Sequence, residues 1–531
     1  MATSTRREFM MSSGSAALSA ALASNMPTTA HAQSKEISDF NIDNAFEGFT
    51  REIGGSPSDG GGKVTFTGKD PIVRSHFRIG ASMAIPAMAG GVGAAAIWRE
   101  RTNEGQDVTV DLRESIYNAM PAMAIVLNAK QRLGKIAMDD PIPGSFSWSP
   151  TINNRSVQAP LLFGNPLSFT IFETKDGRKV TPTGLYPRHF AGFLSIVGAA
   201  PNRASITERI RTWNSGELDE AVSEAGMVMG IHRTAEEWAA HPQGQYLAQK
   251  PVIEIVKIAD SEPYRWTPSP TQPLSGIRVL TNSHVIASTT SARTLAEYGA
   301  EVLHIARDQT MEHELIITDV NVGMRSSLLN LRDASHHKAQ QDLISRADVF
   351  IEGFRGRAME RLGFGPEEMA KQRPGIIYLS VRCYGWNGPW WNRAGFDMEA
   401  LTVTGFTMRE GRGDPRFPPT MVLNDFIAGY IGAAGVLAAL RRRAKEGGSY
   451  HVRISLARAA MWFASLGEFE NTEFDTNDPD HRMIEPRTIT AKTPYGEITR
   501  LAPQAQLSRT PGRWREPLVV VRGGDRPVWQ A

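Results

Sequence analysis

Cysteine is almost absent from this chain, with Cys383 the single example among 531 residues. One thiol cannot form a disulfide within the chain, and it cannot build a cysteine-based zinc or iron–sulfur site by itself. Cys383 follows an apolar run at 376–381. That setting favours a small residue of the core or of a site wall over a reactive nucleophile.

An excess of charge of one sign is also missing. The 58 Lys and Arg residues nearly balance the 56 Asp and Glu residues, which leaves a formal net charge of +2. Such a chain has no whole-protein field that would attract nucleic acid, so we expect no nucleic-acid partner. Hydrophobic residues at 41% and charged residues at 21% are typical of a globular protein. The length predicts two or more domains.

Long hydrophobic runs are lacking as well. The strongest candidate, residues 426–440, is short and rich in Gly and Ala. This composition is typical of a tightly packed buried helix, so the sequence predicts no membrane span.

Several catalytic signatures are missing from the sequence. There is no G-x-S-x-G elbow, no P-loop and no H-E-x-x-H zinc motif. A dinucleotide-binding sheet requires a G-x-G-x-x-G turn after its first strand, whereas the turn at 281–288 contains no glycine. NAD and FAD are therefore disfavoured.

The N-terminal segment has the three-part order of an export signal. Arg6 and Arg7 form a twin arginine, an Ala-rich run follows at 16–23, and residues 30–32 match an A-x-A cleavage pattern. Residues 1–32 therefore resemble a twin-arginine signal and predict a periplasmic destination. The alternative is a chance pair of arginines at the disordered start of a cytoplasmic protein.

Two turn-rich segments predict the domain boundaries. Residues 33–65 are polar and rich in Gly and Ser, and residues 251–273 are rich in Pro. We interpret both as linkers, the first of them flexible. They enclose one domain at 66–250 and leave a second at 274–531. Within the first domain, Asp176-Gly177 predicts a β-hairpin over 168–183.

An internal repeat connects the two domains. Residues 91–112 and 433–456 share one pattern: a helix of small residues, a basic last turn, Glu-Gly, an alternating strand and another helix. Repeats of this kind set the architecture of a protein. The register that aligns Glu104 with Glu446 also pairs Met83 with Asp425, so the first copy lacks the carboxylate of the second.

The second domain alternates short apolar strands with helical segments. The sequence predicts strands at 277–280, 301–305, 349–352 and 376–381, with helices at 292–298, 339–345 and 366–372. This alternation predicts an α/β fold with a parallel sheet.

Two carboxylates stand out as candidates for chemistry. Asp425 precedes the small-residue helix expected to begin near Ile427, which predicts that Asp425 is the N-cap. The same helix N-terminus would hold Asp425 as an anion. Asp397 lies beside a Gly/Pro loop at 385–389 that could line a pocket. The residues alone favour capping for both.

Five stretches of the second domain follow one another in a specific order. They read R-T-L-A-E-Y-G-A-E-V at 293–302, A-D-V-F-I-E-G-F-R at 347–355, Y-L-S-V-R-C-Y-G-W-N-G-P at 378–389, N-D-F-I-A-G at 424–429 and G-G-S-Y-H-V at 447–452. Together they resemble CoA-transferase family III, the CaiB/BaiF family. Residues 78–250 resemble the later part of that fold, which here precedes the earlier part. The resemblance implies a Rossmann-like sheet, a smaller α+β domain and an interlocked homodimer.

The resemblance also implies an activity. The family's catalytic aspartate falls on Asp425, and an assisting acidic residue falls on Asp397. CoA would move between an acyl-CoA thioester and a carboxylic acid through aspartyl anhydride and thioester intermediates. Coenzyme A is then a substrate, and no cofactor is permanently bound. The family's CoA contacts fall on Val285, Leu329, Phe354, Arg361 and Arg382.

The sequence departs from the family pattern around the expected CoA pocket. Ser288-Thr289 replaces the usual Gly-Pro, Gly353 replaces an Asn, and Gly356 replaces a Pro. We expect these changes to weaken CoA binding or activity. Racemases of the family use a His where Phe396 stands, so an acyl-CoA racemase is the alternative function. A non-catalytic CoA-binding or scaffold protein is the third.

Overall fold

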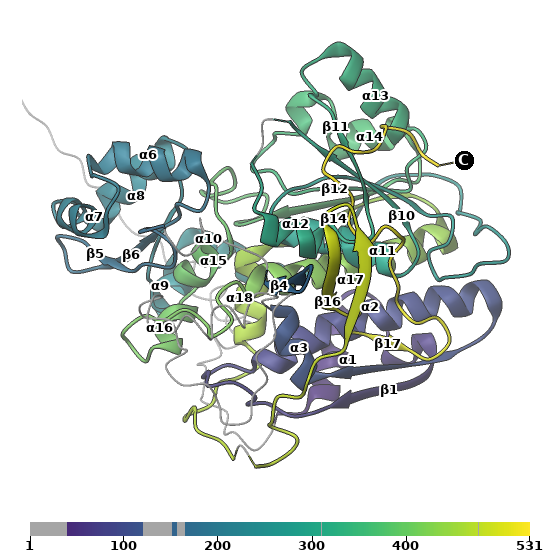
Figure 1. Cartoon of the computed structure of the whole chain (residues 1–531), viewed down its shortest axis with the longest axis horizontal. Helices are drawn as coiled ribbons and strands as arrows, with labels where there is room; N and C mark the ends of the chain where they lie inside the picture. Colours follow the sequence, from purple (N-terminus) through teal and green to yellow (C-terminus); the bar gives the residue numbers. More distant parts are fainter. Residues whose placement is uncertain (1–39, 120–150, 157–164, 309–310, 476, 531) are drawn as a thin grey trace, which may run out of the picture. The chain divides into compact units, whose positions relative to one another are not determined.

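The computed structural model describes residues 40–119, 151–156, 165–308, 311–475 and 477–530 (Figure 1). Residues 40–531 form one compact unit, which the Pro-rich segment at 251–273 does not divide. The proposed signal at 1–32 lies outside the described residues and stays a prediction.

A seven-stranded sheet forms the centre of this unit, with the order β11-β10-β9-β12-β13-β14-β8 (Figure 1). Six neighbouring strands are parallel, and β8 joins β14 in the antiparallel sense. The α/β class and the parallel sheet are therefore confirmed. The strands are β8 (Glu254–Ala259), β9 (Arg278–Asn282), β10 (Glu301–Ala306), β11 (Arg325–Leu328), β12 (Val349–Glu352), β13 (Ile377–Arg382) and β14 (Ser449–Ser455).

Both faces of this sheet are buried. Val349 and Ile351 belong to one hydrophobic core and Phe350 to another, because successive side chains of a strand point to opposite faces. Helices α11 (Ala287–Glu297) and α17 (Asn424–Glu446) contribute to the first core. Leu343 of α13 (Ala334–Ile344) and Met369 of α14 (Pro366–Gln372) contribute to the second.

The internal repeat appears in the structure as two helix–strand–helix units. The first consists of α2 (Ile79–Thr102), β2 (Gln106–Asp111) and α3 (Leu112–Ala119). The second consists of α17, β14 and α18 (Leu456–Ala464). Helices α2 and α17 pack along each other (Figure 1). Gly93 permits this approach, because a Cβ there would lie 3.2 Å from the Leu437 Cβ.

Helix α2 reaches a length that the sequence analysis did not expect. Its length and apolar composition would suffice to cross a membrane, but 94% of its apolar window is buried inside the protein. We therefore interpret α2 as a core helix.

The prediction of two linkers is wrong for the residues that the structure describes, because both segments belong to the fold. Residues 42–67 form α1 (Ile42–Glu52), a 3-10 turn (Pro57–Gly60) and β1 (Gly61–Thr67), which pairs with β2. Phe46 and Phe49 lie one turn apart on α1 and are buried, and this burial holds the segment in place. The Pro-rich segment likewise contains β8, an edge strand of the main sheet.

A smaller α+β module accounts for the later part of the predicted 66–250 domain. Its hairpin strands flank Asp176-Gly177, as predicted. The module has its own hydrophobic core, which includes Phe193 and Leu218. Its elements are β5 (Phe172–Glu173), β6 (Lys179–Pro182), β7 (Met229–Ile231), α6 (Pro187–Val197), α7 (Arg203–Ile210) and α8 (Ser215–Glu224).

The remaining strands complete two further sheets. Strand β17 (Gln506–Leu507) joins β2 in a sheet of the order β1-β2-β17. A four-stranded sheet consists of β15 (Thr488–Thr493), β16 (Gly496–Leu501), β3 (Thr151–Ile152) and β4 (Arg155–Ser156). The remaining helices are α9 (Ala235–Ala240), α10 (Pro242–Ala248), α12 (Glu314–Val320), α15 (Asp397–Val403) and α16 (Phe406–Glu410).

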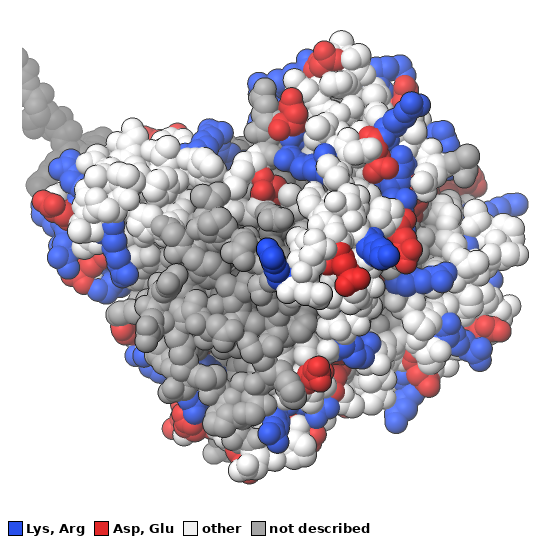
Figure 2. All heavy atoms as spheres, viewed as in Figure 1, with Lys and Arg blue, Asp and Glu red and all other residues white. Residues whose placement is uncertain are grey.

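Figure 2 shows basic and acidic side chains interspersed across the described part of one face, in line with the balanced charge. The interlocked homodimer stays a prediction.

Candidate functional site

Asp425 lies in the first turn of α17 and is only 4% exposed. Its Oδ1 atom is buried and has no hydrogen-bond partner among the described residues. Burial, and after it the charge of Glu399, raise the pKa of Asp425 to about 7. Such a carboxyl is poised between its protonated and ionised forms near neutral pH.

The predicted capping role of Asp425 is wrong, because α17 begins earlier than expected. The helix starts at Asn424, so Asp425 is already within its first turn, and Leu423 at the cap position makes no side-chain cap bond. Asp397 supplies the cap instead: the backbone N–H of Asp425 donates to its Oδ2 at 2.8 Å. Capping by a carboxylate satisfies a free N–H group of the first turn. The side chain of Asp425 is thereby left available for chemistry.

A third carboxyl, Glu399, completes a buried acidic cluster that the sequence analysis missed. Glu399 accepts hydrogen bonds from the Thr183 hydroxyl at 2.5 Å and from the Phe396 N–H at 3.0 Å. Burial raises the pKa of Glu399 to about 7. Burial, followed by the charge of Asp425, raises the pKa of Asp397 well above its usual range. A negative charge on one of these carboxyls therefore disfavours ionisation of its neighbours, and the cluster titrates as a group.

Asp425 opens onto a cavity of about 650 Å³. Among the described lining residues it is the single acidic side chain, and five arginines line the same cavity. Three of the predicted CoA contacts, Val285, Phe354 and Arg382, are in this wall. The structure therefore brings the candidate nucleophile and part of the predicted CoA site together. The five arginines are Arg188, Arg307, Arg355, Arg382 and Arg393.

The other two predicted CoA contacts lie apart from this cavity. Leu329 lines a neighbouring cavity of about 250 Å³, and Phe354 contributes to both cavities. Arg361 is exposed in a 3-10 turn (Glu360–Leu362) and lines neither cavity. Four of the five residues therefore line two cavities that share Phe354, whereas Arg361 lies at the surface.

The departures from the family pattern fit one another in the structure. A Cβ at Gly353 would lie 2.4 Å from the Ser288 hydroxyl oxygen, so the missing side chain at Gly353 makes room for Ser288. Gly356 adopts φ +58°, a conformation closed to the proline that the pattern expects. Because these substitutions are mutually compatible, they leave a defined wall at the cavity.

The smaller module contributes side chains that the sequence analysis did not connect with Asp425. The Tyr186 ring stacks at 6.1 Å on Phe396, and the His189 ring meets Phe396 edge-on at 5.5 Å. The Tyr186 hydroxyl donates to Glu312 at 2.6 Å, and the Val285 N–H donates to the same carboxylate at 2.9 Å. Glu312 thereby fixes Val285, which has φ +63°, next to the smaller module.

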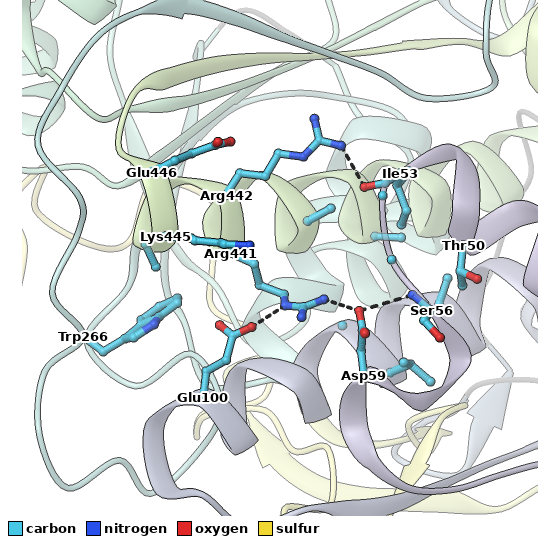
Figure 3. A pocket seen from close by; sticks show the side chains of 18 residues that line it. Thr50, Ile53, Ser56, Asp59, Glu100, Trp266, Arg441, Arg442, Lys445 and Glu446 are labelled. Carbon is cyan, nitrogen blue, oxygen red and sulfur yellow. Dashed lines mark hydrogen bonds and ion pairs between the residues drawn. The ribbon is translucent and has the colours of Figure 1, made fainter.

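A second large cavity, of about 550 Å³, lies between α1, α2 and α17 (Figure 3). Arg441 points across it to Asp59 at 2.5 Å and to Glu100 at 2.7 Å (Figure 3). Arg442 donates to the carbonyl of Ile53 at 2.9 Å (Figure 3). These arginines join α17 to the N-terminal elements. In the described part of the chain, no group of three or more His, Cys, Asp or Glu residues has a metal-binding arrangement.

Residues 274–493 match the family model described as CoA-transferase family III. This segment belongs to CoA-transferase family III. It contains Asp397, Asp425 and all five predicted CoA contacts. The resemblance found in the sequence motifs is therefore confirmed for this part of the chain.

Similar curated proteins carry CoA-transferase names. An acetyl-coenzyme A transferase of Hypoxylon pulicicidum, nodX, is 30% identical over 325 residues, which is 56% of this chain and 55% of that protein. The succinyl-CoA–L-malate CoA-transferase beta subunit of Chloroflexus aurantiacus is 33% identical over 204 residues, 35% of this chain and 49% of that protein. The chain thus spans about half the length of the curated relatives it matches.

Solved structures show a partial likeness. The crystal structure of Rv3272 from Mycobacterium tuberculosis is 30% identical, with a TM-score of 0.35, and the match covers 37% of this chain and 57% of that one.

Proposed function

We propose that this protein is a CoA-transferase that moves CoA from an acyl-CoA thioester to a carboxylic acid. One observation carries the proposal: Asp425, buried in the first turn of α17 with a free oxygen, is the single described acid facing an arginine-lined cavity. The match of this segment to family III and the names of its relatives support the same activity.

The proposed reaction proceeds by covalent catalysis at the Asp425 carboxylate. The carboxylate attacks the thioester carbonyl, the carbon–sulfur bond breaks, and an acyl–aspartyl anhydride and CoA thiolate result. The thiolate attacks the aspartyl carbonyl of the anhydride, which releases the first acid and leaves an aspartyl–CoA thioester. The acceptor carboxylate repeats both steps in reverse order, so the second acid leaves as its CoA thioester and Asp425 is regenerated.

The neighbouring residues have distinct parts in this proposal. Asp397 holds the backbone of Asp425 in place and so fixes the nucleophile against the cavity. The positive potential of the arginines in the wall favours binding of the CoA phosphates and stabilises the departing thiolate. The contacts of Val285, Leu329, Phe354 and Arg382 would hold CoA across the two neighbouring cavities.

Mass spectrometry with hydroxylamine trapping tests this mechanism. The purified chain is incubated with a panel of acyl-CoAs, and hydroxylamine converts the aspartyl anhydride or thioester into a hydroxamate of altered mass. We expect the hydroxamate on the peptide that contains Asp425, and none in the Asp425→Asn variant. A CoA-binding chain that gives no adduct with any donor contradicts the transferase.

An acyl-CoA racemase is the second candidate. Racemases of the family have a histidine where Phe396 stands here, but another histidine faces the same cavity in the structure. His189 contacts Phe396 from the smaller module and lines the cavity with Asp425. Burial, helped by the charge of Arg188, lowers the pKa of His189 to about 4, so its imidazole is neutral near pH 7 and is a weak base. Exchange of the α-proton with deuterated water, without CoA exchange between acids, would favour this function.

The cellular location and the assembly are further proposals. The N-terminal segment supports a periplasmic destination, which fractionation and N-terminal sequencing of the mature chain would test. The resemblance supports a homodimer, which light scattering would test. A monomeric chain with an uncleaved N-terminus in the cytosol would contradict both.

A further inference from the structure

Part of the chain beyond the family match returns to the main sheet. The family model ends at residue 493, whereas residues 523–528 bond to β11, the edge strand of the seven-stranded sheet (the segment is yellow in Figure 1). The N–H of Asp525 donates to the Ser326 carbonyl at 2.7 Å, and the Asp525 carboxylate accepts from the Ser326 N–H at 2.9 Å. An edge strand leaves backbone groups unpaired, and this segment satisfies two of them.

The same segment is anchored further along. Arg325 of β11 donates to the carbonyls of Arg526 at 3.2 Å and Val528 at 2.6 Å. The ring of Trp529 is buried in the second core of the sheet, and its Nε1–H donates to the Leu343 carbonyl at 2.9 Å. These contacts hold the segment in a defined position on the sheet.

A tight turn at 521–524 places the side chain of Arg522. The N–H of residue 524 donates to the carbonyl of residue 521 at 2.9 Å, and Gly523 has φ +77°, as the third position of a type II turn requires. A Cβ at Gly523 would lie 2.5 Å from the Cγ of Leu328, so the glycine lets the turn lie against the end of β11. The backbone therefore holds Arg522 at a fixed point beside this strand.

Arg522 lines the cavity of about 250 Å³ that also contains Leu329. Residues at the carboxyl ends of β9, β10, β11 and β12 form this cavity, and ligands of open parallel sheets bind at that edge. The Arg522 guanidinium donates to the Arg307 carbonyl at 2.6 Å, and Arg307 also lines the Asp425 cavity. Arg522 thus contacts a residue that the two neighbouring cavities share.

The wall of this cavity is partly basic and partly apolar. Among the described lining residues, Arg307, Arg332 and Arg522 are cationic and Glu312 is the single acid. The Glu312 carboxylate already accepts two hydrogen bonds. A wall of this composition suits a ligand that joins an apolar ring to a phosphate. Its apolar side chains include Ile305, Leu329, Leu331, Phe354 and Met359.

We propose that Arg522 binds a phosphate at the nucleotide end of CoA, so that a segment beyond the family match completes the CoA site. The inference rests on the proposed function, in which CoA is a substrate. Guanidinium groups bind phosphates through paired charge-assisted hydrogen bonds. The segment also covers the edge of β11, but that role uses its backbone and Asp525 and does not need the Arg522 side chain. Substitution of this side chain therefore separates the two roles.

Calorimetric titration with CoA tests the assignment. We expect Arg522→Gln to weaken CoA binding by about tenfold or more, and Arg522→Lys to retain part of the affinity. Arg526→Gln is the matched control, because Arg526 is an exposed arginine of the same segment outside both cavity walls, and it should bind CoA like the wild type. Wild-type affinity in Arg522→Gln overturns the proposal.

Two further ligands identify the phosphate. A loss seen with CoA but not with 3′-dephospho-CoA assigns Arg522 to the ribose phosphate, whereas an equal loss with both assigns it to the pyrophosphate. Pantetheine has no phosphate and should bind Arg522→Gln and the wild type alike. Weaker binding of pantetheine by the variant would indicate a disturbed fold and overturns the assignment.

Asp525→Ala tests whether the turn positions Arg522. Loss of the bonds from Asp525 to Ser326 should free the turn and weaken CoA binding, with little further effect in the Arg522→Gln background. Fully additive losses would overturn the positioning by the turn. A chain that binds CoA but transfers none loses the proposed function, while these titrations still test Arg522. A chain that binds neither CoA nor adenosine 3′,5′-bisphosphate overturns the inference itself.

Discussion

The carboxylate of Asp397 accepts the backbone N–H of Asp425 at 2.8 Å. The first repeat unit contains the same device, because Asp70 accepts the N–H groups of Gly80 at 2.9 Å and Ala81 at 2.7 Å. An acid from outside the helix thus caps α2 and α17 alike. Gly80 and Ala81 both donate to this cap, so the residue that corresponds to Asp425 by cap geometry is one of these two, two or three positions before the Met83 of the sequence register.

Asp425→Asn should abolish CoA transfer. An amide keeps the shape of the carboxyl but cannot act as the nucleophile, so we expect a loss of about a thousandfold or more in kcat. CoA exchange between labelled acids measures this. Asp342→Asn is the control, since Asp342 lies in an exposed surface ion pair. Full activity in the Asp425 variant would remove this residue from the mechanism.

The pH dependence of kcat/KM should report the buried acidic cluster. The ionised carboxylate is the nucleophile, so activity should rise with pH and level off above about 7, where burial has placed the pKa of Asp425. Glu399→Gln removes a negative neighbour and should move this midpoint to lower pH. Asp397 faces the same cluster, so the midpoint belongs to the group as a whole.

Glu410→Gln serves as the control for this profile. Burial raises the pKa of Glu410 to about 8, but its carboxylate bonds to the Ser75 hydroxyl and the His76 N–H and not to the cluster at Asp425. Its removal should leave the midpoint where it is. A midpoint that does not move in Glu399→Gln would show that burial alone sets the pKa of Asp425.

Arg361→Gln tests whether the predicted CoA site extends to the surface. Arg361 is exposed and lies outside both cavities, so we expect a modest effect, a weakening of calorimetric CoA binding of about tenfold or less. Arg346→Gln, at another exposed position of the same sheet domain, should bind CoA like the wild type. A hundredfold loss in Arg361→Gln would mean that the surface arginine is a principal anchor.

Gly429→Ala should destabilise the fold. A Cβ there would lie 2.5 Å from the Thr290 Cβ and 2.8 Å from the Ala287 carbonyl oxygen, where α11 and α17 meet. Overpacking of this kind costs about 1–3 kcal/mol in the free energy of unfolding. Gly216→Ala is the control: a Cβ there meets no atom within 4 Å, so about 0.5–1 kcal/mol of stabilisation is expected in helix α8. Denaturant titration measures both, and an unperturbed Gly429→Ala would contradict the close helix contact.

The sequence by itself determined the features that depend on local order. Short apolar strands that alternate with helical segments predicted the parallel sheet, because strands buried on both faces appear in the sequence as apolar runs. Asp176-Gly177 predicted its hairpin from turn chemistry. The ordered motifs around Asp425 identified the family of this segment.

Only the tertiary structure decided which distant residues meet. Composition predicted linkers at 33–65 and 251–273, whereas burial of Phe46 and pairing of β8 with β14 make both segments part of the fold. The cap on α17 and the entry of Arg188 and His189 into the Asp425 cavity join residues far apart in the chain. Periodicity records the environment of one element, but contacts between elements depend on how their surfaces pack, and no local pattern encodes that.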